Sequence, residues 1–363
     1  MALAALGEMF KCVKGPIDGP VLLHSYPTMN TVLVGEDHRI NGSGSAGHEH
    51  VWDIIKTYAA AHPRKTIRLF LEATPSDLYL FRDHCNSPLS TTIKDYFTHM
   101  TKIPKNIIPE QINVRRYPPL CALEILYDEP TYIDIQTRMK PQMTMMDVFK
   151  FHQQAKQFEK AFYAHVNTRA KCSDFFISIV SPISATYPVW FNTWLDTFGI
   201  SKTENPLRDL LRDIHKSDPK FAQALLAVLG NMFSYTVDNN AQYSPAMISM
   251  EKTRRTASSN MVAAKYPTYM TFWISVNSIF MDVYVMALMK KYESVNGDTF
   301  VLMAGFNHVS NIAKYMPTTM KRVSMFNRDG VLRDIGNVPD KLAESPTTLL
   351  AQFRQARAHA NKK

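Results

Sequence analysis

Two short segments near opposite ends of the chain have residue types and spacing suited to chemistry. Gly35-Glu36-Asp37-His38 and Gly305-Phe306-Asn307-His308 are each a Gly-x-x-His that directly follows a hydrophobic run. The two runs, residues 31–34 and 300–304, have the composition of buried β-strands. A glycine there lets the chain turn through conformations closed to other residues. Ligands of open α/β sheets bind beyond the carboxyl ends of strands, so both histidines are predicted to line one site.

Further polar residues are expected at neighbouring strand ends. Glu72 follows a predicted strand over Ile67–Leu71, and Arg115 follows a predicted strand over Gln111–Val114. Imidazole and carboxylate groups together can bind a divalent metal such as Mn²⁺, Co²⁺ or Zn²⁺, or activate water as a general base. A guanidinium can hold an anionic group or stabilise developing negative charge. The predicted catalytic residues are therefore Glu36, His38, Glu72 and His308, with His38, Glu72 and His308 as metal ligands and Arg115 as a substrate contact.

Each of these residues also has an ordinary structural interpretation. A single histidine after a strand is often a turn residue with satisfied hydrogen bonds. Glu72 could cap a helix beginning near Thr74, where negative charge is favourable. Arg115 could form a plain ion pair with Glu124. The joint placement of all four at strand ends is what favours a common site.

Two rival motifs lie between the first strand and the first helix. Residues 42–47 match Gly-x-Gly-x-x-Gly, and Glu72 ends the next strand, as in a dinucleotide-binding fingerprint. In that fingerprint the first glycine follows the strand directly, whereas Gly42 comes seven positions after Gly35. A loop is therefore favoured. His48-Glu49-His50 offers metal ligands, but residues two apart do not share a helical face, which favours a solvated helix start.

The absence of several sequence motifs argues against the classes of function that depend on them. The sequence contains no Gly-x-Ser-x-Gly, Walker phosphate loop, HExxH or CxxC motif, and its four cysteines are widely spaced, as in a reducing compartment. Four of the nine net positive charges lie in the last fifteen residues, so a nucleic-acid partner is not expected, although the basic tail can contact an anionic one. No signal peptide is apparent, and an intracellular, cytoplasmic location is expected.

The apolar run Tyr269–Met289 has about the length of a membrane span. It contains Asn277 and Asp282, which are costly in lipid, so it is predicted to be a buried helix.

The order of the elements predicts an α/β fold with a central, mostly parallel sheet flanked by helices. A helical insertion over about 140–295 is expected within a single domain of residues 1–345, followed by a basic helical tail over 346–363. Further strands are predicted over Thr31–Val34, Thr299–Ala304 and Arg322–Phe326. The predicted helices are Glu49–Ala61, about 74–84 and 87–99, one beginning at Asn205-Pro206, Phe221–Tyr235, Tyr269–Tyr292 and Asn307–Met316.

At its motif residues the chain resembles the superfamily that joins erythromycin esterases, ChaN-like proteins, TraB/PrgY proteins and Tiki proteases. The shared pattern is a strand ending in Gly-Glu-x-His, a strand ending in Glu at Glu72, and a late Gly-x-x-His. The spacing is closest to the ChaN branch, and uncharacterised proteins of large DNA viruses look similar. The helix before the last motif often carries Arg-Asn followed by Met; here Asn277 and Met281 match, while Val276 replaces the arginine.

The resemblance implies an α/β fold with both Gly-x-x-His segments lining one cleft, and Asn277 as a second substrate contact. The leading hypothesis is a hydrolase of ester or peptide bonds that uses water activated by histidine and glutamate, with or without a divalent metal. The loss of the arginine at Val276 favours an alternative, a catalytically inactive binding protein that retains the fold. A dinucleotide-binding enzyme is the third hypothesis.

Overall fold

The computed structural model describes the chain in segments that divide between two compact units. The described residues are 13–14, 17–25, 29–36, 49–72, 102–114, 120, 157, 161–162, 164–166, 169–183, 187–197, 202–239, 278–293, 298–315 and 321–326. The first unit comprises residues 1–113 and 289–350, and the second comprises 114–288 and 351–363. The single domain expected from the sequence stays a prediction.

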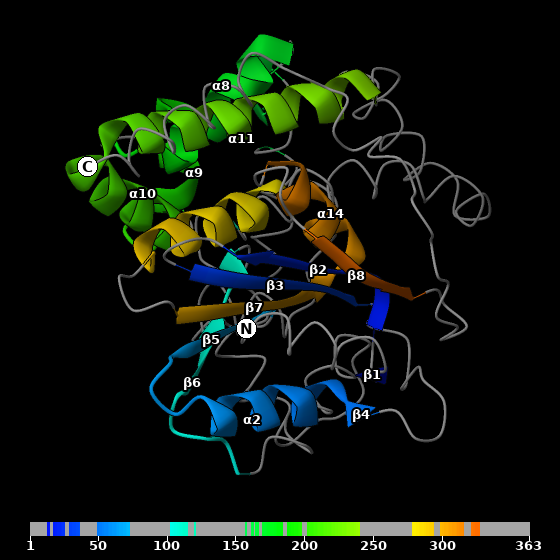
Figure 1. Ribbon diagram of the computed structural model, residues 1–363. Coiled ribbons are helices and arrows are strands. Elements are labelled where there is room, and N and C mark those ends of the chain that lie inside the picture. The colour runs from blue at the N-terminus through cyan, green and yellow to red at the C-terminus, as the bar shows by residue number, and fades with distance from the viewer. Residues whose placement is uncertain are drawn as a thin grey trace, which may run out of the picture. The chain divides into compact units, whose positions relative to one another are not determined.

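The first unit is built on a six-stranded sheet in the order β6-β5-β7-β3-β2-β8 (Figure 1). Its strands are β2 (Ile17–Ser25), β3 (Met29–Glu36), β5 (Ile67–Leu71), β6 (Ile107–Gln111), β7 (Asp298–Gly305) and β8 (Lys321–Phe326). Strands β6, β5, β7 and β3 are parallel, whereas β2 is antiparallel to both of its neighbours. The predicted α/β class with a mostly parallel sheet is confirmed.

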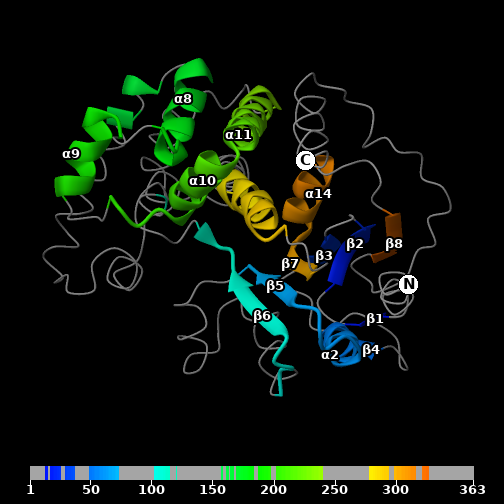
Figure 2. The same cartoon turned by 60° about the vertical axis from the view of Figure 1, so that its left-hand side comes forward.

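The central strands are mostly apolar and largely buried, because both of their faces are covered. All described residues of β7 up to Ala304 are buried, as expected for a parallel strand between two layers of helices. Helix α2 (Val51–Ala61) lies below the sheet and α14 (Phe306–Tyr315) above it in both views (Figures 1 and 2). The Tyr58 hydroxyl on α2 lies 3.3 Å from the Thr299 hydroxyl at the start of β7. The short strands β1 (Val13–Lys14) and β4 (Glu49–His50) pair separately.

One predicted strand was misplaced. The sequence predicts a strand over Gln111–Val114, but β6 ends at Gln111 and pairs with β5 from Ile107 onward. Pro109 lies in the middle of β6, and a proline cannot donate a hydrogen bond to a neighbouring strand. It is accommodated because β6 is an edge strand of the sheet. Residues 112–114 are not part of β6, so Arg115 does not directly follow a strand.

The described part of the second unit is helical. It contains α8 (Arg169–Val180), α9 (Val189–Thr197), α10 (Pro206–Ser217) and α11 (Pro219–Asn239). A further helix, 278–291, crosses the boundary between the units in the sequence and is drawn in yellow in Figure 1. Aromatic rings fill the core of this unit, where Phe233 stacks on Phe176 at 4.7 Å and meets Phe280 edge-on.

Two residues at the start of α10 bind the carboxyl end of α8. Asn205 caps α10, accepting from the Arg208 amide at 3.1 Å, and its side-chain amide donates to the Ile179 carbonyl. The Arg208 guanidinium donates to the Ser178 carbonyl and covers the Tyr187 ring at 4.1 Å. Burial lowers the pKa of Arg208, and the nearby Tyr187 opposes that shift. The predicted helix start at Asn205-Pro206 is confirmed.

Candidate functional site

The carboxyl ends of three adjacent parallel strands meet at one edge of the sheet. Strand β7 lies between β5 and β3, and its register places Met303 opposite Leu71 and Gly305 opposite Glu36. Glu72 follows β5 directly, and β7 runs into α14 without an intervening loop. Three of the positions singled out in the sequence, Glu36, Glu72 and the segment from Gly305, therefore lie at neighbouring strand ends.

Glu72 is bound to the amino end of α14. One oxygen of its carboxylate, Oε2, accepts a hydrogen bond of 3.0 Å from the Gly305 backbone amide, the residue before the helix. Within a helix, a glutamate three residues after the cap can bind the cap amide in this way. Here the glutamate comes from a neighbouring strand instead. Its negative charge is favourable at the positive end of the helix dipole.

The second oxygen of the same carboxylate faces His308 in the first turn of α14. Glu72 Oε1 lies 3.5 Å from His308 Nε2, and the two side chains are 4% and 7% exposed. The separation exceeds a normal hydrogen bond but is within contact distance of an ion pair. One buried carboxylate thus connects the start of α14 with the imidazole that this helix carries. The predicted proximity of Glu72 and His308 is observed.

The remaining predicted residues are only partly described. Glu36 is the last residue of β3, one strand away from Gly305. His38, Arg115, Val276 and Asn277 lie outside the described residues, as do the Gly42–Gly47 loop and His48. The expected approach of His38 to His308 therefore stays a prediction.

The donor set at Glu72 and His308 is suited to a metal. Two ligands about 2.1 Å from a tetrahedral ion are ~3.4 Å apart, close to the separation of Oε1 and Nε2. A third ligand is needed, and the sequence predicts it to be His38. Within the described ranges no group of three or more His, Cys, Asp or Glu residues could hold a metal ion. The two described groups fit as part of a metal site.

The segment His48-Glu49-His50, for which metal binding was the less favoured interpretation, has a structural role at His50. This residue caps α2, and its imidazole nitrogen Nδ1 accepts from the Trp52 amide at 3.4 Å. The predicted helix start is close, since α2 begins at Val51. The expectation that this start would be solvated holds for Glu49, which is exposed, and is wrong for His50. His50 is only 8% exposed, because the residues that follow it, Val51 and Trp52, are fully buried.

A second polar cluster lies at the start of β5 and was not predicted. Arg68 pairs with Glu110 at 3.1 Å, and its guanidinium lies 3.6 Å from the centre of the Tyr292 ring. Burial, followed by a hydrogen bond to Glu110, raises the pKa of Tyr292 to about 12. The sequence did contain a signal for this cluster, namely a charged residue, Arg68, inside the strand Ile-Arg-Leu-Phe-Leu. A half-buried arginine needs a partner.

A comparison of the chain with protein-family models, with curated proteins and with solved structures finds no match. The resemblance to the erythromycin esterase and ChaN superfamily accordingly rests on the motif residues alone. No helix in the described part of the chain is long and apolar enough to cross a membrane.

Proposed function

We propose that this protein is a hydrolase of ester or peptide bonds whose site lies at the carboxyl edge of the sheet. The observation that carries the proposal is the buried pair of Glu72 and His308, with 3.5 Å between Oε1 and Nε2. A carboxylate beside an imidazole is a recurrent arrangement for orienting a general base that takes a proton from water. Glu36 lies at the strand end that adjoins Gly305, and it is predicted to complete the site together with His38, two positions later in the sequence.

The proposed roles follow from the contacts. Glu72 is fixed by the Gly305 amide, so it holds the His308 imidazole in a constant place at the start of α14. His38 and Glu36 would supply the second imidazole and carboxylate. A divalent metal, where bound by His38, Glu72 and His308, would act as a Lewis acid and lower the pKa of water.

The test is an assay of the full-length protein on a chromogenic ester and a quenched fluorescent peptide. Each reaction is run after chelation and with added Mn²⁺, Co²⁺ or Zn²⁺. We expect turnover that falls at least about a hundredfold in His308→Ala. His62→Gln is the matched control, since His62 directly follows α2 as its C-cap and its imidazole lies 2.9 Å from the Tyr58 carbonyl. Equal loss in both variants would contradict the proposed site.

One observation favours a second candidate, a binding protein without catalysis. The Glu72 and His308 side chains are nearly inaccessible, and Glu72 already stabilises the start of α14. A purely structural carboxylate would make the same contacts. Absence of hydrolysis with every metal would support this candidate over the hydrolase, whereas loss of stability in Glu72→Ala is expected for both.

A further inference from the structure

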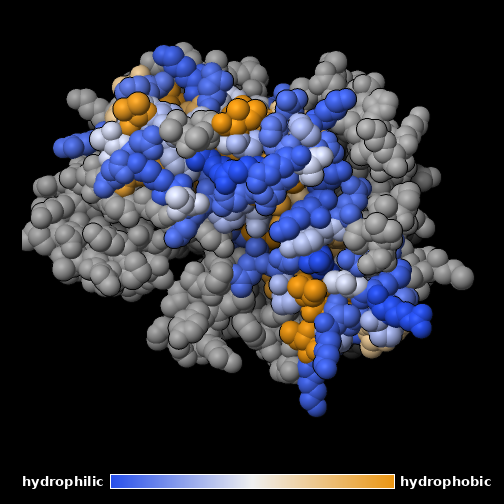
Figure 3. Space-filling model, turned by 90° about the vertical axis from the view of Figure 1, so that its left-hand side faces the viewer, coloured by the Kyte–Doolittle hydropathy of each residue, from blue (hydrophilic) through white to orange (hydrophobic). Residues whose placement is uncertain are grey.

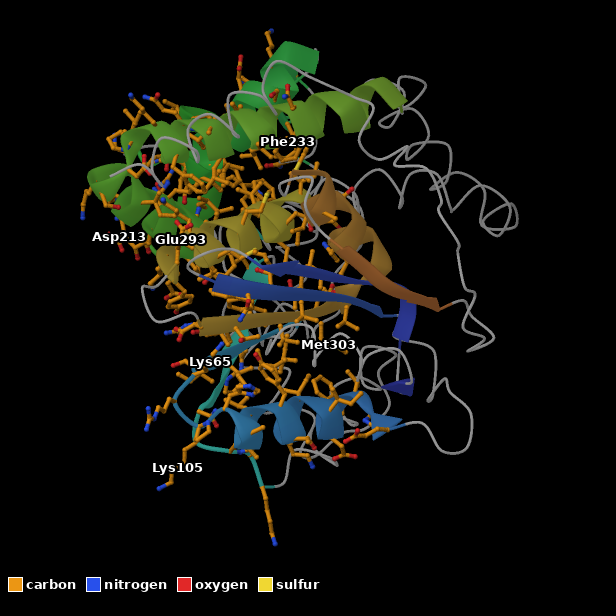
Figure 4. All side chains as sticks on the ribbon, viewed as in Figure 1. Lys65, Lys105, Asp213, Phe233, Glu293 and Met303 are labelled. Carbon is orange, nitrogen blue, oxygen red and sulfur yellow. The ribbon has the colours of Figure 1, made fainter. Side chains whose placement is uncertain are left out.

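Two loops at the amino ends of the parallel strands, away from the candidate hydrolase site, carry exposed positive charge. They precede β5 and β6 and comprise residues 62–66 and 102–106, here called the basic edge loops. Arg64, Lys102 and Lys105 are exposed and Lys65 is half-buried. Figure 4 labels Lys65 and Lys105 at this edge and Met303 toward the carboxyl ends of the strands. The loops are therefore separate from the candidate hydrolase site.

The basic edge loops are held together by hydrogen bonds rather than by ion pairs. The Asn106 side-chain amide donates to the Ala59, His62 and Lys65 carbonyls at 3.0–3.1 Å. The Ile67 amide donates to the Asn106 carbonyl at 2.8 Å. A single asparagine thus fixes one loop on the other, so the four cations are presented from a defined backbone.

Within the described ranges, no acid pairs with the cations of these loops. Residues 61–66 and 102–109 contain no acid. Among the described acids nearest along the chain, Glu110 pairs with Arg68 and Asp53 pairs with Lys56. Glu72, at the other end of β5, accepts from the Gly305 amide. Among the residues that the structure describes, none of Arg64, Lys65, Lys102 and Lys105 has an ion-pair partner.

Two exposed isoleucines accompany these cations. Ile103 lies between Lys102 and Lys105 and is 37% exposed, and Ile108 is 39% exposed on the edge strand β6. They are two of only four large hydrophobic residues that are exposed in the described part of the chain. Figure 3, which faces this side of the molecule, shows a hydrophobic patch on its lower part within a mostly hydrophilic surface.

We infer that the basic edge loops are a docking surface for an anionic lipid membrane. Lysine and arginine heads can reach lipid phosphates while aliphatic side chains enter the boundary of the acyl region. A nucleic acid would also attract the four cations, but exposed isoleucines give it neither base stacking nor hydrogen bonds. The proposed docking surface combines cations that have no ion-pair partner among the described residues with exposed isoleucine side chains. This combination favours a lipid surface.

The test is sedimentation of the full-length protein with vesicles of phosphatidylcholine, with or without about a third phosphatidylserine. We expect binding only to the anionic vesicles. Each basic residue near such a surface changes affinity by about fivefold. Lys102→Gln with Lys105→Gln should therefore weaken binding about 25-fold, and Ile103→Ser alone about tenfold. Raising the salt from about 0.1 M to about 0.5 M should remove most of the binding by screening.

Matched controls separate this inference from general charge effects and from the proposed hydrolase. Lys216→Gln with Lys220→Gln removes two exposed lysines from α10 and α11 and should leave vesicle binding unchanged. Circular dichroism checks that every variant is folded, and hydrolysis should persist in the loop variants. Equal binding to neutral vesicles, or equal loss in the control variant, would overturn the inference. Binding of a single-stranded oligonucleotide without vesicle binding would overturn it in favour of a nucleic-acid partner.

Discussion

The Glu72 carboxylate accepts a hydrogen bond of 3.0 Å from the Gly305 amide, although 233 positions separate the two residues in the sequence. This contact joins the end of β5 to the start of α14. The same carboxylate faces His308, so one residue serves both the local stability of α14 and the candidate chemistry.

Glu72→Ala is expected to destabilise the protein by about 1–3 kcal/mol, because it leaves the Gly305 amide without this acceptor in a part-buried position. Glu72→Gln keeps an acceptor oxygen and should cost less than about 1 kcal/mol. The free energy of unfolding is measured in urea with each variant. Equal stability of the alanine variant and the unchanged protein would contradict a role for Glu72 in holding α14.

His38 and Glu72 are expected to act as one unit in hydrolysis. Residues that act together in catalysis are non-additive, so removing either should cost nearly as much rate as removing both. The measurement compares kcat/KM of His38→Ala, Glu72→Gln and the double variant on the same substrate. Losses that multiply in the double variant would show that the two residues act independently.

Asn205→Ala is expected to cost about 2–3 kcal/mol of stability. Asn205 is 1% exposed, caps α10 and donates to the Ile179 carbonyl, so its loss removes a cap and leaves a buried carbonyl without a donor. Asn192→Ala is the control, since this half-buried residue donates a single hydrogen bond of 2.7 Å to the Tyr187 carbonyl. Its removal should cost about 1 kcal/mol. Equal losses would contradict the double role of Asn205.

Tyr292 is expected to make stability fall as the pH rises from about 10 to about 12. Its pKa is raised from 10.0 to about 12 in the folded protein, so the unfolded chain releases this proton first. The unfolded state is then favoured by about 1 kcal/mol, allowing for solvent screening of the half-buried ring. Tyr292→Phe should lose less stability over this range. The difference in absorbance at about 295 nm between the unchanged protein and Tyr292→Phe isolates this phenolate among the sixteen tyrosines. A difference that titrates near pH 10 in the folded protein would contradict the shift.

The sequence alone was enough for those elements whose pattern is local. Strand β5 was predicted with its observed bounds, and β3, β7, β8, α2 and α14 were predicted to within a few residues. Their signals are continuous apolar runs or helical periodicity, which neighbouring residues determine. The α/β class follows from the alternation of these elements. The position of Glu72 directly after β5 was also readable from the sequence.

Only the tertiary structure decided features that depend on pairing partners. Strand β2 was not predicted. The strand predicted in place of β6 began several residues too late, because Pro109 is tolerated only in an edge strand and the sequence does not reveal that β6 is one. The sequence could nominate Glu72 and His308, but the strand order that places β7 between β5 and β3 brings their ends together. The partner of Glu72 is a backbone amide, and every residue except proline has one, so no sequence pattern could have identified it.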